Sequence, residues 1–260
     1  MGDDYLNSFI GWIGGKKLLR KEIKNRFPES YGRYIEVFGG AAWVLFAKES
    51  HAQLEVYNDA NGDLVNLFRC TKYHCSELQK ELSFMLNSRE LFEDFKSQYN
   101  TKGMTDIQRA ARYFMLVKTS YGSDARTFGC VKKDVSVMVK YLESIVERLS
   151  KVVVENKDFE NLIKVYDRPN ALFYLDPPYF GTEKYYSAAF TTEDHVRLSA
   201  TLKNIKGNFV LSYNDCDYIR ELYKGFRIEE ISRNHNLAGR FEDKPHSYNE
   251  LIIRNFNTGL

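Results

Sequence analysis

The tetrapeptide Asp176-Pro177-Pro178-Tyr179 places a carboxylate, two rigid residues and an aromatic ring in direct succession. Neither proline can donate a backbone hydrogen bond, and each fixes its own φ angle. Asp176 is also restricted, because the residue before a proline is disfavoured in the helical region. We therefore expect a stiff loop that presents a carboxylate, a carbonyl and an aromatic face. These groups can hold the planar amino group of a nucleobase, since both oxygens accept N–H bonds while the ring stacks.

The apolar run Ala171–Leu175 directly before this loop is typical of a buried β-strand. Strands are continuously apolar when both faces of their sheet are covered. Six further runs resemble strands: Tyr34–Phe38, Leu54–Tyr57, Lys151–Val154, Asn208–Tyr213, Phe226–Ile231 and Glu250–Phe256. The last two are close together in the sequence and can form an antiparallel pair.

Helical patterns lie between many of these runs. The two clearest are Leu19, Ile23 and Phe27, and Leu198, Leu202 and Ile205. Thr191 or Thr192 can serve as the N-cap of the second helix. Strands that alternate with helices predict an α/β fold, here a seven-stranded, mostly parallel sheet with helices on both faces.

Residues 62–150 break this alternation, because they contain helical patterns and no clear strand. Thr105 and Gln108 have the spacing of a capping box before an apolar helix, and a loop follows that helix. We therefore expect a helical lobe at 62–150, inserted into an α/β domain formed by 1–61 and 151–260.

The first strand run leads into a turn of small residues, Gly39-Gly40-Ala41-Ala42, and residues 43–46 are expected to begin a helix. Small residues allow a ligand to approach the backbone, and a helix N-terminus offers amide donors. The second run ends at Asn58-Asp59, about twenty residues later, where nucleotide-binding folds place an acid for ribose hydroxyls. The pattern predicts a nucleotide crevice.

Two further segments contain candidate ligand contacts. Asp158 can accept a hydrogen bond from an adenine amine while Phe159 packs on the ring, although a loop acid and a core phenylalanine are the simpler interpretation. The segment Trp12-Ile13-Gly14-Gly15-Lys16 suggests a phosphate loop, but Lys17 stands where that motif requires serine or threonine. A nucleoside triphosphate site is therefore not expected.

The composition fits one folded core, with 43% hydrophobic, 28% charged and 15% aromatic residues in 260 positions. The net charge of +2 does not by itself indicate a nucleic-acid partner, although residues 16–26 are strongly basic. None of the four cysteines forms a Cys-x-x-Cys pair, so no metal is expected. The acidic N-terminus and the lack of a long apolar run predict a cytoplasmic protein without a signal peptide or membrane contact.

The order of these motifs resembles that of the D12 class, Dam-type, DNA adenine methyltransferases, which transfer a methyl group from S-adenosylmethionine to the 6-amino group of adenine. The similarity lies in Trp12-x-Gly-Gly-Lys16, Glu36-Val-Phe-Gly-Gly40, Asn58-Asp-x-Asn61, Asp176-Pro-Pro-Tyr179, Phe190-Thr191-x-x-Asp194-His195, Phe209-Val-Leu-Ser-Tyr-Asn214 and Asn249-Glu-Leu-Ile-Ile253. It implies a Rossmann-like methyltransferase in which 1–61 and 151–260 bind the cofactor and 62–150 carry most contacts to double-stranded DNA.

The resemblance also implies roles for individual residues. Those at the cofactor are Trp12 and Lys16 at the methionine end, Phe38, Gly39 and Gly40 at the turn, Asp59 at the ribose, Asp158 and Phe159 at the adenine ring, and Asp176. The catalytic residues that the resemblance implies are Asp176, Pro177, Pro178 and Tyr179. Candidate DNA contacts are Lys118, Tyr121, Ser123, Arg126 and Lys132. The chain is expected to act as a monomer, or as a dimer on DNA, in a bacterium or a phage host.

Two departures from the family pattern concern affinity and target sequence. The turn usually reads Phe-x-Gly-x-Gly, whereas this chain has Ala42 at the last position. Members that read GATC commonly have a lysine before the tryptophan of the first motif, where this chain has Gly11, and a longer hairpin than 120–129. GATC is therefore a candidate target only.

Three alternatives remain open at this point. The same loop geometry can serve the 4-amino group of cytosine, although serine is then more common than Asp176. A nicotinamide-dependent oxidoreductase would use the glycine turn and Asp59 but leaves the Asp-Pro-Pro-Tyr loop unexplained. A DNA-binding module with a decayed methyltransferase fold is supported only by Ala42.

Overall fold

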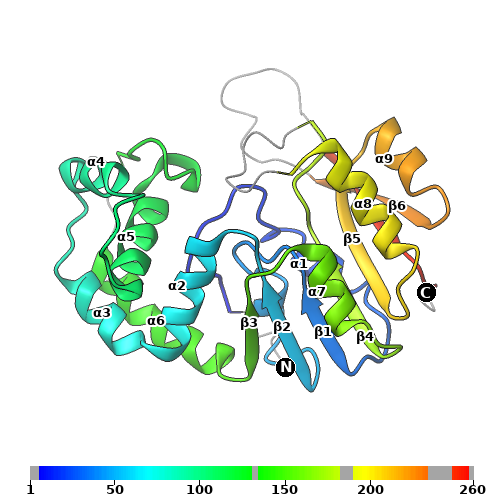
Figure 1. The fold of residues 1–260 in the computed structure, drawn as a ribbon, viewed down its shortest axis with the longest axis horizontal. Coiled ribbons are helices and arrows are strands. Elements are labelled where there is room, and N and C mark those ends of the chain that lie inside the picture. Colours follow the sequence, from blue (N-terminus) through cyan, green and yellow to red (C-terminus); the bar gives the residue numbers. More distant parts are fainter. Residues whose placement is uncertain (1–5, 131–133, 182–189, 234–247, 258–260) are drawn as a thin grey trace.

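The computed structural model describes residues 6–130, 134–181, 190–233 and 248–257. Within them, a seven-stranded sheet has the order β3-β2-β1-β4-β5-β7-β6 (Figure 1). The strands are β1 (Arg33–Glu36), β2 (Leu54–Asn58), β3 (Val152–Glu155), β4 (Ala171–Leu175), β5 (Asn208–Asn214), β6 (Arg227–Arg233) and β7 (Tyr248–Arg254). Strands β1 to β5 pair in parallel, and β7 runs antiparallel to both β5 and β6. The predicted α/β fold and the antiparallel end pair are confirmed.

Side chains that alternate along the strands build one core on each face of the sheet. On one face, Phe173 and Leu211 pack with three helices, α7 (Phe159–Tyr166), α8 (Thr192–Leu202) and α9 (Asp217–Leu222). On the other face, Tyr34, Tyr57 and Tyr174 pack with α1 (Arg20–Lys24) and α2 (Gly62–Tyr73). This two-sided cover explains why the central strand runs are continuously apolar. Thr191 caps α8.

The described part of the segment 62–150 consists of helices and the loops that join them, and an isolated bridge between Ser120 and Phe128 is its only β pairing there. After α2 come α3 (Cys75–Ser83), α4 (Arg89–Ser97), α5 (Asp106–Thr119), the 3-10 turn η2 (Tyr121–Ser123) and α6 (Val135–Leu149). These helices lie beside the β3 edge of the sheet (Figure 1). The expected capping box of Thr105 and Gln108 begins α5.

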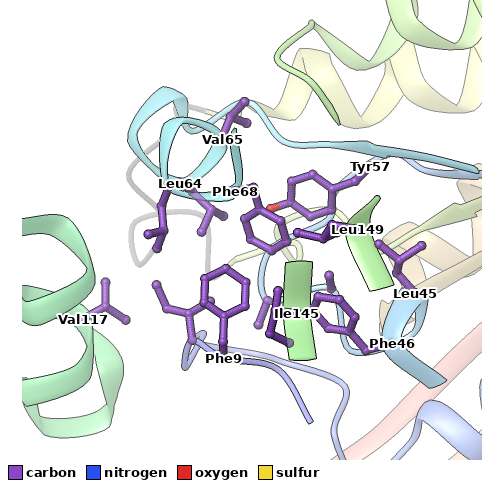
Figure 2. Packing of buried hydrophobic residues seen from close by; sticks show 14 of the residues in the cluster. Phe9, Leu45, Phe46, Tyr57, Leu64, Val65, Phe68, Val117, Ile145 and Leu149 are labelled. Carbon is purple, nitrogen blue, oxygen red and sulfur yellow. The ribbon is translucent and has the colours of Figure 1, made fainter. Parts of the chain in front are cut away.

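Helix α2 joins the helical region to the sheet through one continuous core (Figure 2). The ring of Phe68 stacks on Tyr57 of β2 with centroids 4.0 Å apart, and Phe9 meets its edge at 4.9 Å. Val117 of α5 and Ile145 of α6 belong to the same cluster. Each such buried side chain stabilises the fold by about 1.5–3 kcal/mol, so the helices are fixed relative to the strands.

The helix expected after the glycine turn does not form; only a short 3-10 turn, η1 (Leu45–Ala47), is present. Distant side chains occupy the carbonyls that a longer helix would use. Arg148 donates to the oxygens of Leu45 and Lys48 at 2.8 Å each, and His51 Nε2 lies 2.9 Å from the oxygen of Val44. The prediction of a helix that begins at residues 43–46 was therefore wrong, because only the 3-10 turn η1 forms there.

Candidate active site

A cleft of about 970 Å³, open solvent included, lies at the carboxyl ends of β1, β2 and β4. The strand order reverses between β1 and β4, because β2 and β3 follow on one side and β5 on the other. Open α/β sheets bind ligands at such a reversal, where the loops diverge and leave room. Phe38, Asp59 and Asp176 line the cleft from three different strand ends.

Asp59 ties the glycine turn to the end of β2. Its Oδ2 atom accepts the backbone N–H of Gly40 at 2.8 Å, and its Oδ1 atom accepts that of Asn61 at 2.8 Å. Burial raises the pKa of this carboxyl, while the two amide donors act to lower it. Each oxygen keeps a further lone pair that can accept a hydrogen bond from a ligand.

The glycine turn permits close packing that a side chain would prevent. A Cβ atom on Gly39 would lie 2.2 Å from the ring of Tyr57, and one on Gly40 would lie 2.7 Å from Trp12. Gly40 also has a positive φ of 49°, and Ala42 follows with a φ of 55°. The methyl group of Ala42 is accommodated in the core, although alanine in this conformation costs about 1–2 kcal/mol.

Three phenylalanine rings form an apolar wall of the cleft. The centroid of Phe38 lies 5.7 Å from that of Phe159 and 5.8 Å from that of Phe190. The guanidinium of Arg197 lies over Phe159, 4.1 Å from its centroid, and binds both oxygens of Asp158. A planar ring can pack on such a wall, with polar groups at its edge.

Asp158 is the N-cap of α7 and not a loop residue. Its Oδ1 atom accepts the N–H groups of Glu160 and Asn161 at 3.0 and 3.4 Å. Burial acts to raise the pKa of Asp158, but these amides and Arg197 outweigh it, so the pKa is lowered. The carboxylate is thus held at the cleft with its charge retained.

Asp176 begins the loop after β4 and lies against Lys16. The Lys16 Nζ atom is 2.9 Å from Asp176 Oδ1 and 3.0 Å from the carbonyl oxygen of Gly14. Ser212 also donates to Asp176 Oδ1, at 3.3 Å. Burial raises the pKa of Asp176 to about 6 despite the lowering effect of Lys16. The carboxylate is therefore a stronger proton acceptor than an ordinary aspartate.

Glu36 adds a further buried carboxyl to the cleft. It lies at the end of β1 and accepts the hydroxyl hydrogen of Tyr34 at 2.7 Å. Burial raises its pKa to about 8, although the bond from Tyr34 acts to lower it. Burial therefore favours the protonated form of this carboxyl at neutral pH.

Tyr179 lies beside Asp176 with its hydroxyl fixed. The hydroxyl donates to Glu250 Oε2 at 2.9 Å, and Lys16 Nζ lies 4.8 Å from the centroid of the tyrosine ring. Glu250 Oε2 is 3.9 Å from the same Lys16 nitrogen. The ring is therefore held at both its edge and its face.

All nine residues that the resemblance implies for cofactor binding line one cleft. They are Trp12, Lys16, Phe38, Gly39, Gly40, Asp59, Asp158, Phe159 and Asp176. Pro178 lines it as well, while Pro177 and Tyr179 belong to the same loop. The lining residues that sequence reasoning did not assign include Glu36, Trp43 and Arg197. Arg197 lies just after the motif that ends at His195, and its partner Asp158 is far away in the sequence.

The candidate DNA contacts that the structure describes lie within α5 and in the loop that follows it. Tyr121 is 75% exposed, whereas Lys118 is half-buried over the ring of Phe114. Ser123 and Arg126 line a second cavity that shares Trp12, Ile13 and Asn61 with the first. Lys132 lies outside the described residues.

The loop between Ser120 and Gly129 is internally braced. The N–H of Tyr121 donates to Thr127 at 2.7 Å, and Asp124 Oδ1 accepts the N–H of Arg126 at 2.8 Å. Ser123 and Ala125 have positive φ angles of 62° and 57°, a conformation that neighbouring bonds must hold in place. The loop can therefore present its exposed side chains in a defined position.

The same loop packs against the segment before Trp12. A Cβ atom on Gly11 would lie 2.0 Å from Ser123 Oγ and 2.8 Å from Ser123 Cβ. No side chain fits at Gly11 unless the loop shifts. The position at which GATC-reading members have lysine is thus filled here by the loop itself.

The lining of the cleft suits S-adenosylmethionine in three respects. Carboxylates at Asp59, Asp158 and Asp176 suit a ligand that carries positive charge and ribose hydroxyls. The phenylalanine wall suits a planar base. The missing Cβ atoms at Gly39 and Gly40 allow a ligand to approach the backbone.

Other classes of site find little support in the described part of the chain. No three His, Cys, Asp or Glu side chains there converge as a metal site would require. None of the helices in that part combines the length and apolar character needed to cross a bilayer.

Comparison with known proteins agrees with this geometry. The chain is 24% identical over 268 residues to the type II methyltransferase M.CviBI of Paramecium bursaria Chlorella virus NC1A, covering 96% of this chain and all of that protein. It is 23% identical to a DNA adenine methylase of Haemophilus influenzae, over 88% and 87% of the two chains. The modification methylase StsI of Streptococcus sanguinis is 23% identical over 70% of this chain and 30% of its own length. Residues 12–237 match the model of a known family. The chain belongs to the D12 class N6 adenine-specific DNA methyltransferases.

Proposed function

We propose that Asp176 and Pro177 hold the 6-amino group of an adenine flipped out of double-stranded DNA, while Tyr179 stacks on the base. The observation that carries the proposal is the position of Asp176, in one cleft with the glycine turn and Asp59. An amine held at Asp176 would lie beside a nucleoside bound along that turn. Adenine methylation is the activity of the family, so the cytosine and oxidoreductase alternatives fall away.

The chemistry follows from the acceptor groups of the loop. An aromatic amine is a poor nucleophile because its lone pair is delocalised into the ring. Asp176 and the Pro177 carbonyl can each accept one N–H, which draws the nitrogen towards tetrahedral geometry and frees the lone pair. The two interactions strengthen as positive charge develops on nitrogen, so they favour the transition state. With a pKa of about 6, Asp176 can then take the proton that the nitrogen loses.

The residues of the cleft would hold the methyl donor. When bound there, S-adenosylmethionine would supply an electrophilic methyl group on its sulfonium sulfur, and the C–S bond that breaks would give S-adenosylhomocysteine. We assign the ribose to Asp59, the base to the wall of Phe38 and Phe159, and the methionine end to Trp12 and Lys16. The transfer needs no metal ion.

We assign DNA binding to the helical insert, residues 62–150, and its braced loop. Arginine can read guanine in the major groove and tyrosine can wedge between bases, which suits Arg126 and Tyr121. Lys118, Ser123 and Lys132 complete the set. The residues that line the cleft all come from one copy of the chain, so we infer that it acts as a monomer. We also infer that it acts in the cytoplasm of a bacterial or phage-infected cell. The target sequence, for which GATC is one candidate, would come from methylation-sensitive sequencing of DNA from cells that express the chain.

The test of the proposed site is Asp176→Ala. We expect methyl transfer to DNA to be abolished while calorimetry still detects S-adenosylmethionine binding. Asp217→Ala, in the exposed first turn of α9, is the matched control and should behave as wild type. Nucleoside analysis of the wild-type product should give N6-methyladenine. Undiminished methylation by Asp176→Ala would refute the assignment.

A further inference from the structure

Glu250 is a buried carboxylate that contacts the catalytic loop from β7, outside the lining of the cleft. Its side chain is 5% exposed, and its Oε2 atom binds the Tyr179 hydroxyl at 2.9 Å. The same atom lies 3.9 Å from Lys16 Nζ. Glu250 therefore contacts both residues that flank Asp176.

The strand pairing explains how Glu250 reaches this place. It lies opposite Asn214 at the end of β5, next to the strand that precedes Asp176. It alternates with Leu251, so it points to the same face of the sheet as Ile252, where Tyr174 and Val210 are buried. A carboxylate at such an inward position destabilises the fold unless charged or hydrogen-bonding groups compensate it.

Lys16 is shared between two carboxylates. Its nitrogen lies 2.9 Å from Asp176 and 3.9 Å from Glu250, and the lysine side chain is only 4% exposed. Charges in such a dry setting interact more strongly than they would in water. Glu250 therefore offsets part of the lysine charge that would otherwise neutralise Asp176. In agreement, Glu250 acts to raise the pKa of Asp176, whereas Lys16 acts to lower it.

We propose that Glu250 is a positioning residue for methyl transfer, which fixes the ring of Tyr179 for the flipped base and keeps Asp176 a strong acceptor by sharing Lys16. The inference rests on the proposed roles of Asp176 and Tyr179. Glu250 acts through these neighbours and does not itself touch the reacting atoms. A purely structural role would predict lower stability with no change in the pH dependence of the reaction.

The first variant is Glu250→Gln, which keeps an oxygen for the Tyr179 hydroxyl but removes the charge. We expect kcat at neutral pH to fall about tenfold, and the acidic limb of the kcat profile to move to lower pH, because one cause of the raised Asp176 pKa is gone. The unfolding temperature and the S-adenosylmethionine dissociation constant should stay near wild type. Glu230→Gln, an exposed glutamate on the neighbouring strand β6, is the control.

The second variant is Tyr179→Phe, which keeps the ring and Glu250 but removes their hydrogen bond. We expect about a tenfold decrease in kcat/KM and a weaker 2-aminopurine fluorescence increase when the probe replaces the target adenine. The double variant should lose less than the product of the two single losses, because Glu250→Gln takes the charge from the hydrogen bond that Tyr179→Phe removes.

The outcomes separate this inference from the proposed function. An active Asp176→Ala enzyme would refute the proposed function. If Asp176→Ala is inactive while Glu250→Gln keeps the wild-type kcat and pH profile, only the role of Glu250 is overturned. Multiplicative losses in the double variant would overturn it too. Should Glu250→Gln fail to fold, unchanged kcat/KM and fluorescence in Tyr179→Phe would refute the inference.

Discussion

Lys16 and Asp176 form an ion pair of 2.9 Å that joins the first motif of the chain to the catalytic loop. The lysine was expected at the methionine end of the cofactor. In the structure it also governs the charge of the carboxylate that we assign to the amine. Under the proposed assignments, cofactor binding and activation of the base would share one side chain.

The acid limb of the reaction should report Asp176. Because its pKa is raised to about 6 and the carboxylate is the active form, kcat/KM should fall about tenfold per pH unit below that value. Lys16→Met should move this limb to higher pH, since the ammonium group acts to lower the pKa. Lys21→Met, an exposed residue of α1, is the control. The pH dependence of kcat/KM, measured for wild type and for both variants, tests this prediction. If the acidic limb of Lys16→Met lies at the wild-type pH, Lys16 does not set the pKa of Asp176.

Glu36 should make the folded chain less stable as the pH rises. Its pKa is raised from 4.5 to about 8, so the native state binds more protons than the unfolded state between these values. The contribution of Glu36 to the free energy of unfolding is therefore greatest below about pH 4.5, and it is lost as the pH rises to about 8. Glu36→Gln should flatten the dependence of the unfolding free energy on pH, measured by urea titration. The exposed Glu49→Gln should leave the slope unchanged; an equal slope in both variants would exclude Glu36 as its source.

Contact between Gly11 and Ser123 should couple the loop to the cofactor motif. Gly11→Ala places a methyl group 2.0 Å from Ser123 Oγ, so it should displace the loop and weaken DNA binding, measured by fluorescence anisotropy. Adding Ser123→Gly should restore much of the affinity, because it removes the clash and suits the positive φ at that position. Gly62→Ala, whose Cβ meets nothing closer than 3.7 Å, is the control. No recovery in the double variant would argue against this contact as the cause.

Arg126 should influence which sequence is methylated. Its backbone is held by Asp124 and by Lys96, whose Nζ donates to the Arg126 carbonyl at 2.8 Å, so the side chain starts from a fixed point. Arg126→Ala is expected to relax the target sequence at one position, with a loss of about 1–3 kcal/mol in discrimination. Methylation-sensitive sequencing would show the relaxed target sequence. Lys102→Ala, at an exposed position of the same helical insert, is the control. If Arg126→Ala methylates the same sequence motif at the wild-type rate, Arg126 does not read the target sequence.

The strands and the catalytic loop could be predicted because local sequence determines them. Continuous apolar runs require cover on both faces, and the two prolines after Asp176 stiffen any loop that contains them. The glycine turn was recognised for the same reason. The residues proposed to bind the cofactor then converge because parallel strands bring their carboxyl ends to one edge of the sheet.

Contacts between distant segments could not be predicted in the same way. Residues 43–46 look helical by themselves, but Arg148 and His51 bind the carbonyls that the helix would need. Likewise, nothing near Arg197 indicates that it binds Asp158, and nothing near Glu250 indicates that it binds Tyr179. Such pairings depend on the packed arrangement of helices and strands.

The place of β7 has a consequence for the order in which the enzyme matures. This strand inserts between β5 and β6, although it follows both in the sequence. While the ribosome is still adding residues up to 247, β5 has an open edge and the catalytic loop lacks Glu250. An unpaired edge strand exposes the nascent chain to aggregation. Insertion of β7 closes this edge and brings Glu250 to Tyr179, so one strand completes both the sheet between β5 and β6 and the contact with the Asp176–Tyr179 loop.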